Sequence, residues 1–471
     1  MRYNINMGSK RITVTIVDHV YCKTNREGRR FLAPCLSYFA SSWRQGQYKK
    51  IETLNKKNMI DISGRFLIGL LPRVEKYCKF KKYELTINDL RTKLPNIPLD
   101  MNNFNRFVKK TKELIKENYR ENQMEKQISL INSAITKGHG VIVSPTGSGK
   151  TTLAMGVVSY YPKYKFLYIV HTKSLASQTS KNFKEYGVSV STIMEGNKDQ
   201  SGQIVVGTRQ SLVSMKLEKY DFVIIDEVHH MSDEDSQYGK ILTKINHNRK
   251  FGFTATHKET KEKVKLAIEG LIGGVIEEFT REEAQKMEIL AKPSVKIIKI
   301  PRQFIESSKY EDVYKEAVVN SRIRNKIICE TVKNFIKDNK TVMIYVTLIS
   351  HGKEIQKVAK SLFNMKIPFI YSKTSSERRE ELKSKIRRKE LLKFITTNVW
   401  KEGIDIPELD VVINANGGKD DLQIVQLMGR GLRKTARKNK MTFVDFFDQS
   451  NHFLIKHFGN RVSLYCKEGW L

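Results

Sequence analysis

The sequence predicts an α/β protein in which two parallel-sheet domains follow one another behind a small α+β domain. Short apolar runs of strand length alternate with amphipathic helical stretches from about residue 120 to 285. The same alternation returns from about residue 300 to 450. Residues 1–100 differ from both blocks, because they combine strand-like runs with a helical stretch and carry a denser positive charge.

The expected strands of the two larger domains are short, apolar and followed by charged or turn residues. Strands of this kind are typical of a parallel sheet covered on both faces, with functional groups at its carboxyl edge. In the first domain we expect strands at 141–143, 166–170, 204–206, 222–225 and 251–253. In the second domain we expect them at 342–346, 369–371, 394–396, 411–413 and 442–446.

The chain is expected to divide into four parts. These are a basic N-terminal accessory domain at 1–112, a first core domain at 113–290, a second core domain at 291–455 and a C-terminal tail at 456–471. In the accessory domain, strand-like runs at 12–17 and 82–87 accompany a helical spacing at 64–79. A proline-containing run at 94–100 indicates a linker, and residues 285–300 are the expected hinge.

Composition restricts the class of partner. Lysine and arginine number 84 against 50 acidic residues, a net charge of +34, and residues 1–100 alone carry 20 against 8. Such an excess favours a polyanion, since each cation that meets a phosphate releases a counterion. No run approaches the roughly 20 apolar residues that span a bilayer, so we expect no membrane partner and a cytoplasmic location. The five cysteines are dispersed, which argues against a structural zinc site.

The strongest motif is SPTGSGKTT, which follows an apolar strand and opens a helix. In a P-loop, backbone N–H groups and the helix N-terminus surround the β-phosphate of a nucleotide. Lys150 is expected to neutralise the β- and γ-phosphates, and Thr151 to bind Mg²⁺. We therefore predict ATP and Mg²⁺ as cofactors. The predicted nucleotide contacts are Ser144, Pro145, Thr146, Gly147, Ser148, Gly149, Lys150, Thr151 and Thr152.

A second motif, YDFVIIDEVHH, places two carboxylates at the end of an apolar strand about 80 residues after the P-loop. Asp226 is expected to bind Mg²⁺ together with Thr151. Glu227 is expected to orient and deprotonate the attacking water. Two adjacent histidines are too few for a metal site, so His229 is interpreted as a coupling residue.

The DEVH run resembles the DExH box of superfamily 2 helicases, and further motifs of that superfamily occur in order between residues 119 and 433. The resemblance implies two tandem RecA-like P-loop domains. The run YRENQ is similar to the upstream glutamine motif, with Gln123 as the candidate adenine reader and Gln127 as the alternative. The run Thr254-Ala255-Thr256 is similar to motif III, which implies coupling roles for Thr254 and Thr256.

Both core domains carry segments that resemble the helicase motifs for nucleic-acid contact. The runs HTKSLASQ and VGTRQSL lie in the first domain, and VTLISHG and TTNVWKEGIDIP in the second. The last run resembles motif V, in which Gly403 and Asp405 are implied to belong to the nucleotide site. The implied nucleic-acid contacts are Thr172, Lys173, Thr208, Arg209, Gln210, His351 and Thr397.

The run QLMGRGLR resembles motif VI, whose arginines reach the γ-phosphate. Arginine suits this task because it stays charged and offers a planar fork of donors. Arg430 and Arg433 are the implied arginine fingers, and Gln426 is the implied sensor of nucleotide or water. ATP would then favour closure of the two domains, and hydrolysis would release them.

Within the superfamily, the motif sequences and compact length resemble the phage UvsW-type DNA helicases, relatives of RecG- and XPB-like enzymes. The resemblance implies an ATP-dependent DNA helicase or translocase that remodels forks and Holliday junctions in recombination, repair and replication. It also implies a monomer in a host cytoplasm, beside other replication or recombination proteins. The alternatives are an RNA helicase and a translocase subunit of a larger complex. The accessory domain would bind DNA, with contacts at Arg29, Arg30, Arg44, Lys49 and Lys50.

Overall fold

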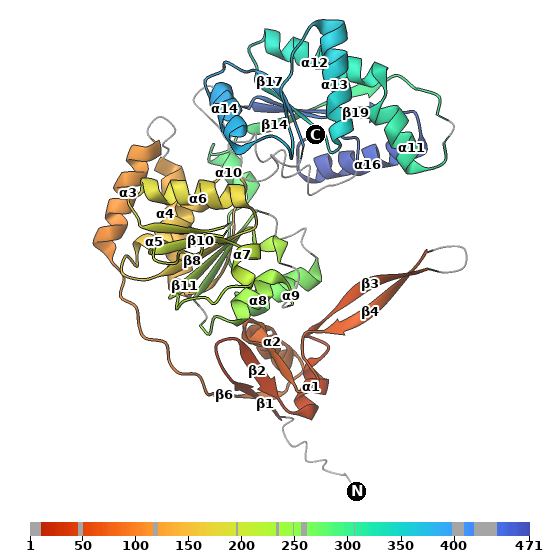
Figure 1. Cartoon of the computed structure of the whole chain (residues 1–471). Helices are drawn as coiled ribbons and strands as arrows, with labels where there is room; N and C mark the ends of the chain where they lie inside the picture. The colour runs from red at the N-terminus through yellow and green to blue at the C-terminus, as the bar shows by residue number, and fades with distance from the viewer. Residues whose placement is uncertain are drawn as a thin grey trace. The chain divides into compact units, whose positions relative to one another are not determined.

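The chain folds into two compact units (Figure 1). The computed structural model describes residues 11–45, 50–115, 121–194, 196–231, 235–247, 249–255, 261–305, 307–397, 409–418 and 440–471. The first unit comprises 1–115, 124–144 and 149–280, and the second comprises 116–123, 145–148 and 281–471. Among the described residues, no helix is both long and apolar enough to cross a membrane.

The N-terminal part of the first unit is an α+β domain, as predicted. Its four-stranded sheet has the order β5-β2-β1-β6, formed by β1 (Arg11–Ile16), β2 (Tyr21–Thr24), β5 (Arg65–Leu67) and β6 (Glu84–Asp89). Helices α1 (Arg26–Leu32) and α2 (Leu71–Phe80) accompany the sheet. The predicted helix therefore starts later than residue 64. Pro72 lies in the first turn of α2, where its missing N–H costs no hydrogen bond.

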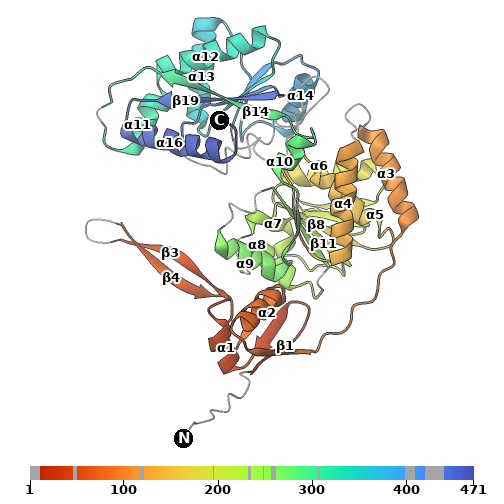
Figure 2. The same ribbon diagram turned by 180° about the vertical axis from the view of Figure 1, so that it is seen from behind.

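A β-hairpin that the sequence did not predict interrupts this domain. Strands β3 (Ser37–Gln45) and β4 (Lys50–Asn58) pair in antiparallel register over nine residues each. The hairpin extends away from the N-terminal sheet in both ribbon views (Figures 1 and 2). The sequences of its strands, SYFASSWRQ and KIETLNKKN, lack the continuous apolar run on which a sequence-based prediction depends.

The core of the first unit is a seven-stranded sheet of order β13-β7-β12-β11-β8-β10-β9, in which every neighbouring pair is parallel. The five predicted strands are confirmed as β7 (Gly140–Val143), β8 (Phe166–Val170), β10 (Ile204–Thr208), β11 (Phe222–Asp226) and β12 (Lys250–Thr254). The sequence analysis missed the two edge strands, β9 (Val190–Ile193) and β13 (Val275–Glu278).

Helices cover both faces of this sheet. Helices α4 (Glu121–Lys137) and α5 (Lys150–Ser159) lie on one side, and α8 (Gln237–Thr243) and α9 (Glu262–Leu271) on the other (Figures 1 and 2). Helix α3 (Met101–Ile115) packs on α5 through Phe104 and Tyr160, whose rings stack with 4.1 Å between centroids. The core domain of this unit therefore begins near residue 101 and includes α3. The predicted boundary at 113 lies inside that helix.

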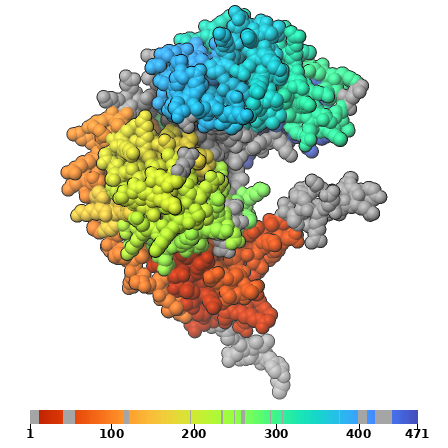
Figure 3. Space-filling model, viewed as in Figure 1, coloured from red at the N-terminus to blue at the C-terminus, as the bar shows by residue number. Residues whose placement is uncertain are grey.

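The N-terminal domain packs directly on α9 of the same unit. A 3₁₀ turn, η1 (Ile68–Leu70), approaches the helix so closely that a Cβ at Gly69 would lie 1.9 Å from the carbonyl oxygen of Glu269. Arg73 Nη2 donates to Glu269 Oε2 at 3.0 Å across the same junction. Buried residues of the N-terminal and core domains form one continuous hydrophobic cluster. The two surfaces meet in the space-filling view (Figure 3).

The second unit contains a six-stranded sheet of order β14-β19-β18-β15-β17-β16, again parallel at every neighbouring pair. The predicted strands are present as β15 (Val342–Tyr345), β16 (Phe369–Ile370), β17 (Lys393–Thr396), β18 (Val411–Asn414) and β19 (Lys440–Asp448). The main helices are α12 (Arg322–Lys337), α13 (Ile349–Phe363) and α14 (Ser376–Arg387).

Two segments of the second unit differ from the predictions. Most of the expected hinge at 285–300 is strand β14 (Lys292–Ile300), which pairs with β19 along its whole length. The expected tail at 456–471 forms most of helix α16 (His452–Lys467), which packs on β19. Its face includes buried Leu454, Arg461, Leu464 and Tyr465. The lysines interleaved in β14 and the polar surface of α16 masked these elements in the sequence.

Candidate active site

Three predicted motifs meet at the carboxyl edge of the first sheet. The P-loop follows β7, Asp226 ends β11, and Thr254 ends β12. These strands are neighbours in the order β7-β12-β11. The backbone N–H of Ser144 donates to the carbonyl oxygen of Thr254 at 2.8 Å, which joins the start of the P-loop to motif III.

The P-loop has the backbone that its glycines predict. Gly147 and Gly149 have φ values of 90° and 94°, a region that residues with a Cβ seldom adopt. Gly149 immediately precedes α5, which starts at Lys150. A Cβ at Gly149 would lie 2.3 Å from Nε2 of Gln127, which is buried. The structure therefore brings Gln127, the alternative adenine reader, against the P-loop, whereas Gln123 is half-buried one turn earlier on α4.

Lys150 and Glu227 form an ion pair of 2.5 Å between Nζ and Oε1. Burial alone would raise the pKa of Glu227, but Lys150 and His229 outweigh it and hold this pKa below its ordinary value. Burial, followed by the Glu227 charge, raises the pKa of neighbouring Asp226 to about 6. The two adjacent carboxyl groups thus have opposite tendencies, as expected for groups with different tasks.

Glu227 is also held in an uncommon backbone conformation, with φ at 52° and ψ at 57°. Left-handed residues other than glycine are uncommon and gather at functional sites. Its Oε2 is buried and lies 3.4 Å from Nδ1 of His229. This oxygen is suited to accept a hydrogen bond from a water molecule. The donor set thus fits a nucleotide with Mg²⁺, with Lys150 for phosphate and the buried carboxylates for the ion and the water.

His229 connects the DEVH run to motif III. Its Nδ1 lies 3.0 Å from Thr254 Oγ1, so the predicted coupling residues His229 and Thr254 are in contact. The sequence analysis missed a second connection, in which the rings of His171 and His230 lie 4.3 Å apart between centroids. His171 follows β8, the strand beside β11, so its position after an adjacent strand was the available signal. Thr256 lies outside the described residues.

The predicted nucleic-acid contacts of this unit gather at the same edge, over the neighbouring strands β8 and β10. Thr172 caps helix α6 (Lys173–Glu185) by accepting from Leu175 N, and Thr208 caps α7 (Arg209–Val213) by accepting from Ser211 N. Lys173 and Gln210 are exposed. The guanidinium of Arg209 lies over the Tyr238 ring at 5.6 Å. The structure thus groups these residues beside the nucleotide motifs, and their contact with nucleic acid stays a prediction.

His351 contradicts the prediction that it contacts nucleic acid. Its side chain is fully buried, and its Nε2 lies 3.1 Å from Asn325 Oδ1. Burial, with the nearby Arg324 charge, keeps the pKa of His351 well below its ordinary value. This buried, neutral histidine links α13 to α12, so its side chain is not accessible to nucleic acid. Thr397, at the end of β17, is also buried, with 6% of its surface exposed.

The remaining predicted residues of the second unit lie outside the described part of the chain. They are Gly403, Asp405, Gln426, Arg430 and Arg433. The described stretches on either side end at Gly418 and resume at Lys440. The roles of these five residues stay predictions.

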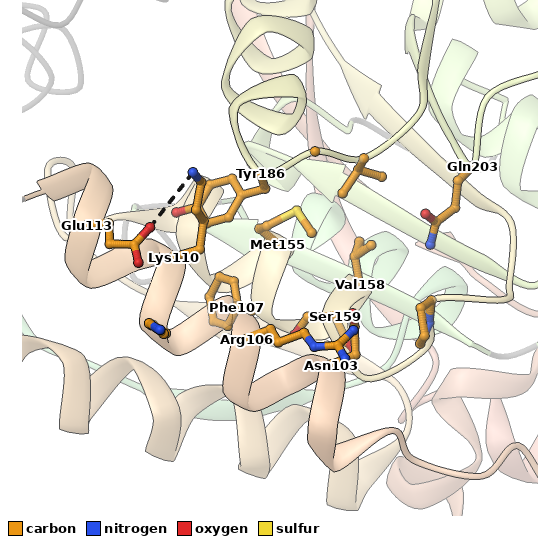
Figure 4. A pocket seen from close by; sticks show the side chains of 14 residues that line it. Asn103, Arg106, Phe107, Lys110, Glu113, Met155, Val158, Ser159, Tyr186 and Gln203 are labelled. Carbon is orange, nitrogen blue, oxygen red and sulfur yellow. Dashed lines mark hydrogen bonds and ion pairs between the residues drawn. The ribbon is translucent and has the colours of Figure 1, made fainter.

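A separate surface pocket of about 430 Å³ lies between α3, α5 and the end of α6 (Figure 4). Phe107 and Arg106 of α3 face Met155 and Val158 of α5 across it, with Tyr186 at one end. These α5 residues follow Lys150 by at least one helical turn. The pocket therefore borders the helix that the P-loop opens but contains none of the predicted nucleotide contacts.

Two sequence families match the chain in tandem. Residues 101–259 match the family described as the type III restriction enzyme res subunit, and residues 324–435 match the helicase conserved C-terminal domain. The chain therefore contains two helicase domains in tandem. This confirms the predicted family and the two tandem RecA-like domains. It also identifies the chain as an ATP-dependent enzyme of the helicase class.

Named relatives cover most of the chain. It is 22% identical to the ATP-dependent DNA helicase uvsW of Enterobacteria phage T4, over 87% of this chain and 88% of that protein. It is 25% identical to the DNA 3'-5' translocase XPB2 of Sulfurisphaera tokodaii, over 66% of this chain and 79% of that protein. Among solved structures, the DUF1998 helicase MrfA bound to DNA is 17% identical, with a TM-score of 0.59 over 78% of this chain and 51% of that one. The last likeness concerns the fold alone.

Proposed function

We propose that this chain is a DNA helicase or translocase that uses ATP hydrolysis to remodel branched DNA such as forks and four-way junctions. The observation that carries the proposal is the Lys150–Glu227 pair at the sheet edge, joined through His229 to Thr254. These contacts connect the proposed site of ATP hydrolysis to motif III, the motif that couples the nucleotide state to the nucleic acid. The relatives named as DNA helicase and DNA translocase, together with the net charge of +34, support DNA as the track.

The roles of the described residues follow from their chemistry. Lys150 neutralises phosphate charge, and the carboxylate of Glu227 accepts a proton from the attacking water. Thr151 and Asp226 would hold Mg²⁺, which would neutralise the phosphates in turn. Arg430 and Arg433 add positive charge at the γ-phosphate, with Gln426 as a sensor. Gly403 and Asp405 belong to the same site, and either Gln123 or Gln127 reads the adenine.

The track residues follow from their place over β8 and β10. We propose that the N-termini of α6 and α7 approach the nucleic-acid backbone, with Thr172 and Thr208 fixing those ends and Lys173 and Arg209 adding charge. The protein would act as a monomer in the cytoplasm of a host cell, beside other replication or recombination proteins, because the compared relatives include a phage helicase.

The test is ATP hydrolysis and strand separation on matched DNA and RNA forks and on a four-way DNA junction. Lys150→Ala removes the phosphate-binding cation, and Lys357→Ala is the matched control, since Lys357 is exposed and forms an ion pair with Glu354 one helical turn away. We expect turnover to be stimulated most by branched DNA, to be lost in Lys150→Ala and to persist in the control. Stimulation by RNA alone would contradict the DNA assignment, and turnover retained in Lys150→Ala would contradict the site.

A second candidate function is a translocase subunit of a larger machine. The match of residues 101–259 to the type III restriction enzyme res subunit favours this alternative. It predicts ATP hydrolysis stimulated by duplex DNA without strand separation on any substrate. The same set of substrates therefore distinguishes the two functions.

A further inference from the structure

Four consecutive residues of the second unit, 415–418, are held by side chains from several other elements. We call them the exit segment, because they lead from the end of β18 to residue 419, where the stretch that contains motif VI begins. Ala415 and Asn416 are buried. Gly417 has a φ of 69°, a conformation that favours glycine. The exit segment is therefore the last described part of the chain before Gln426, Arg430 and Arg433.

Arg461 of α16 holds the second half of this segment. Its Nη1 donates to the carbonyl oxygens of Gly417 at 3.0 Å and Gly418 at 2.8 Å. Its Nε donates to Asp445 Oδ2 of β19 at 2.7 Å, and its Nη2 donates to Asp445 Oδ1 and to the carbonyl oxygen of Phe446. The Arg461 guanidinium thus connects the exit segment to β19, the strand that follows the motif VI stretch in the chain.

The first half of the segment is held by side chains that come earlier in the chain. Arg324 of α12 donates from Nη1 to the carbonyl oxygen of Ala415 at 2.8 Å and from Nε to Asp448 Oδ1 at 3.0 Å. The side-chain oxygen of Asn416 accepts from the hydroxyl of Tyr314 and from that of Thr347, each at 2.6 Å. Thr347 belongs to the run that resembles motif IV. Each of the four residues is therefore fixed through its carbonyl or its side chain.

Both arginines and their carboxylate partners are almost fully buried. Taking two such charges out of water is costly, and apolar residues of similar volume often stabilise a fold as well or better. Stability alone is thus a weak reason for two buried pairs. The planar guanidinium fork can hold backbone carbonyls and a carboxylate in one fixed geometry, which an apolar side chain cannot do.

We propose that Arg461, together with Arg324, is a positioning residue for motif VI, and that it sets the arginine fingers by fixing the exit segment from which their stretch departs. The inference rests on the proposed function, because it assigns the fingers to Arg430 and Arg433. Arg461 does not contact nucleotide in this scheme. It acts through the backbone of Gly417 and Gly418.

The test compares Arg461→Lys with Arg281→Lys in the full chain. Lysine keeps the charge beside Asp445 but offers no planar fork for the two glycine carbonyls. Arg281 is the matched control, because it forms an ion pair with Glu468 at the end of the same helix and is not among the side chains that hold the exit segment. We expect Arg461→Lys to lower kcat for ATP hydrolysis by about tenfold to hundredfold, the scale of a small misplacement of catalytic groups. The KM for ATP and the affinity for DNA should change little.

Arg433→Ala separates positioning from a general loss of structure. If Arg461 acts through the fingers, Arg461→Lys should lower kcat much less in the Arg433→Ala background than in the unaltered chain. Additive losses, or an Arg461→Lys chain that has a lower melting temperature but an unchanged kcat, would overturn the inference. Melting temperatures are measured for every variant. If the unaltered chain shows no Lys150-dependent hydrolysis, the proposed function fails and this inference fails with it. If that hydrolysis is present and Arg461→Lys leaves kcat unchanged, this inference alone fails.

Discussion

At the scale of single residues, the two central charged side chains of the proposed nucleotide site form an ion pair with each other. Lys150 Nζ and Glu227 Oε1 lie 2.5 Å apart, so each neutralises the other inside a largely buried site. Phosphate oxygens would compete with Glu227 for the same ammonium group. When the lysine turns to phosphate, the carboxylate loses its cation and becomes a stronger proton acceptor. In the proposed mechanism, this ion pair would therefore link nucleotide binding to activation of the base.

Glu227→Gln tests this link, because glutamine keeps the shape of the side chain but cannot take a proton. We expect ATP hydrolysis to fall by at least about a hundredfold, the scale of a lost general base. Binding of DNA and of ATP should persist, since Lys150 remains and is freed from its acidic partner. The measurements are steady-state hydrolysis and titration with a fluorescent ATP analogue. Glu218→Gln is the control, because Glu218 pairs with Lys165 outside the site. Retained turnover in Glu227→Gln would contradict the assignment.

Lys250 is a second buried cation, and the proposed mechanism does not use it. Its Nζ donates to the carbonyl oxygen of Leu242 at 3.0 Å, and burial lowers its pKa from 10.5 to about 7. Between pH 7 and 10.5 the unfolded chain therefore holds a proton that the folded chain lacks. The free energy of unfolding contributed by this group then rises with pH across that window, by about 1.4 kcal/mol per pH unit.

Lys250→Met should remove this dependence. We expect the variant to gain most stability over the unaltered chain at and below pH 7, and to lose that advantage progressively toward pH 10.5. The measurement is denaturant unfolding at a series of pH values. Lys244→Met is the matched control, because exposed Lys244 also donates to a backbone carbonyl, that of Val213 at 3.0 Å. A difference between Lys250→Met and the unaltered chain that does not vary with pH would contradict the expectation.

The sequence predicted residues whose chemistry is tied to a short motif. Lys150, Glu227, His229 and Thr254 were all assigned from local runs, and the structure brings them together. The sequence could not predict which single positions are buried, because burial depends on elements that are distant in the chain. His351 was expected to contact nucleic acid because its run resembles a helicase motif, yet it is buried against Asn325 of α12. The contact of Gln127 with Gly149 was equally hidden, because it joins two helices.

At the scale of elements, the contact between η1 and α9 joins the accessory domain to the first core domain. Gly69 and Gly270 allow the two backbones to approach, and Leu67 packs where a Cβ of Gly270 would lie. Helix α9 also contacts η3 (Val228–His230), the turn that follows Glu227. The accessory domain is thus packed on a helix that borders the hydrolytic motif.

Gly69→Ala should strain this junction. Its new Cβ would meet the backbone carbonyl of Glu269 at 1.9 Å, and a backbone atom cannot move aside cheaply. We expect a loss of about 1–3 kcal/mol of stability, the usual effect of overpacking, with faster hydrogen exchange in α9. Gly274→Ala is the control, because nothing lies within 4 Å of a Cβ at that position. Equal melting temperatures and equal exchange for both variants would contradict the prediction.

The elements that the sequence predicted are those whose burial is strong and continuous. The five central strands of the first sheet are buried along their lengths, so their apolar runs were visible. Strands β3, β4 and β14 mix polar and apolar residues, because a hairpin or an edge strand meets solvent on more sides. Most of helix α16 was expected to be a C-terminal tail, and its buried Arg461 could not be recognised from the sequence. Its partner Asp445 lies on a strand 16 positions earlier, and only the fold shows that the two meet.

At the scale of the whole molecule, residues 1–100 carry +12 of the net charge of +34, a higher density than in the rest of the chain. Helix α1 and the end of α2 lie side by side, because the Phe31 ring stacks on Tyr83 at 4.0 Å and lies 5.2 Å from Tyr77. Exposed cations lie near these aromatic residues in the sequence, on α1, at the end of α2 and in the turn that follows α2. They include Arg30, which the sequence analysis proposed as a contact, and Lys79 and Lys82. Arg44, Lys49 and Lys50 of the hairpin have side chains outside the described set.

Joint substitution of Arg30, Lys79 and Lys82 by alanine should therefore weaken DNA binding through charge alone. Each cation that meets a phosphate contributes about 0.9 to the slope of log affinity against log salt concentration. We expect the slope to become shallower by about two to three, with ATP hydrolysis in the absence of DNA unchanged. The matched control replaces three exposed lysines of the second unit, Lys333, Lys337 and Lys340. Equal slopes for the two triple variants would mean that the accessory domain meets no phosphate at these positions, and that the core domains supply the charge that grips the track.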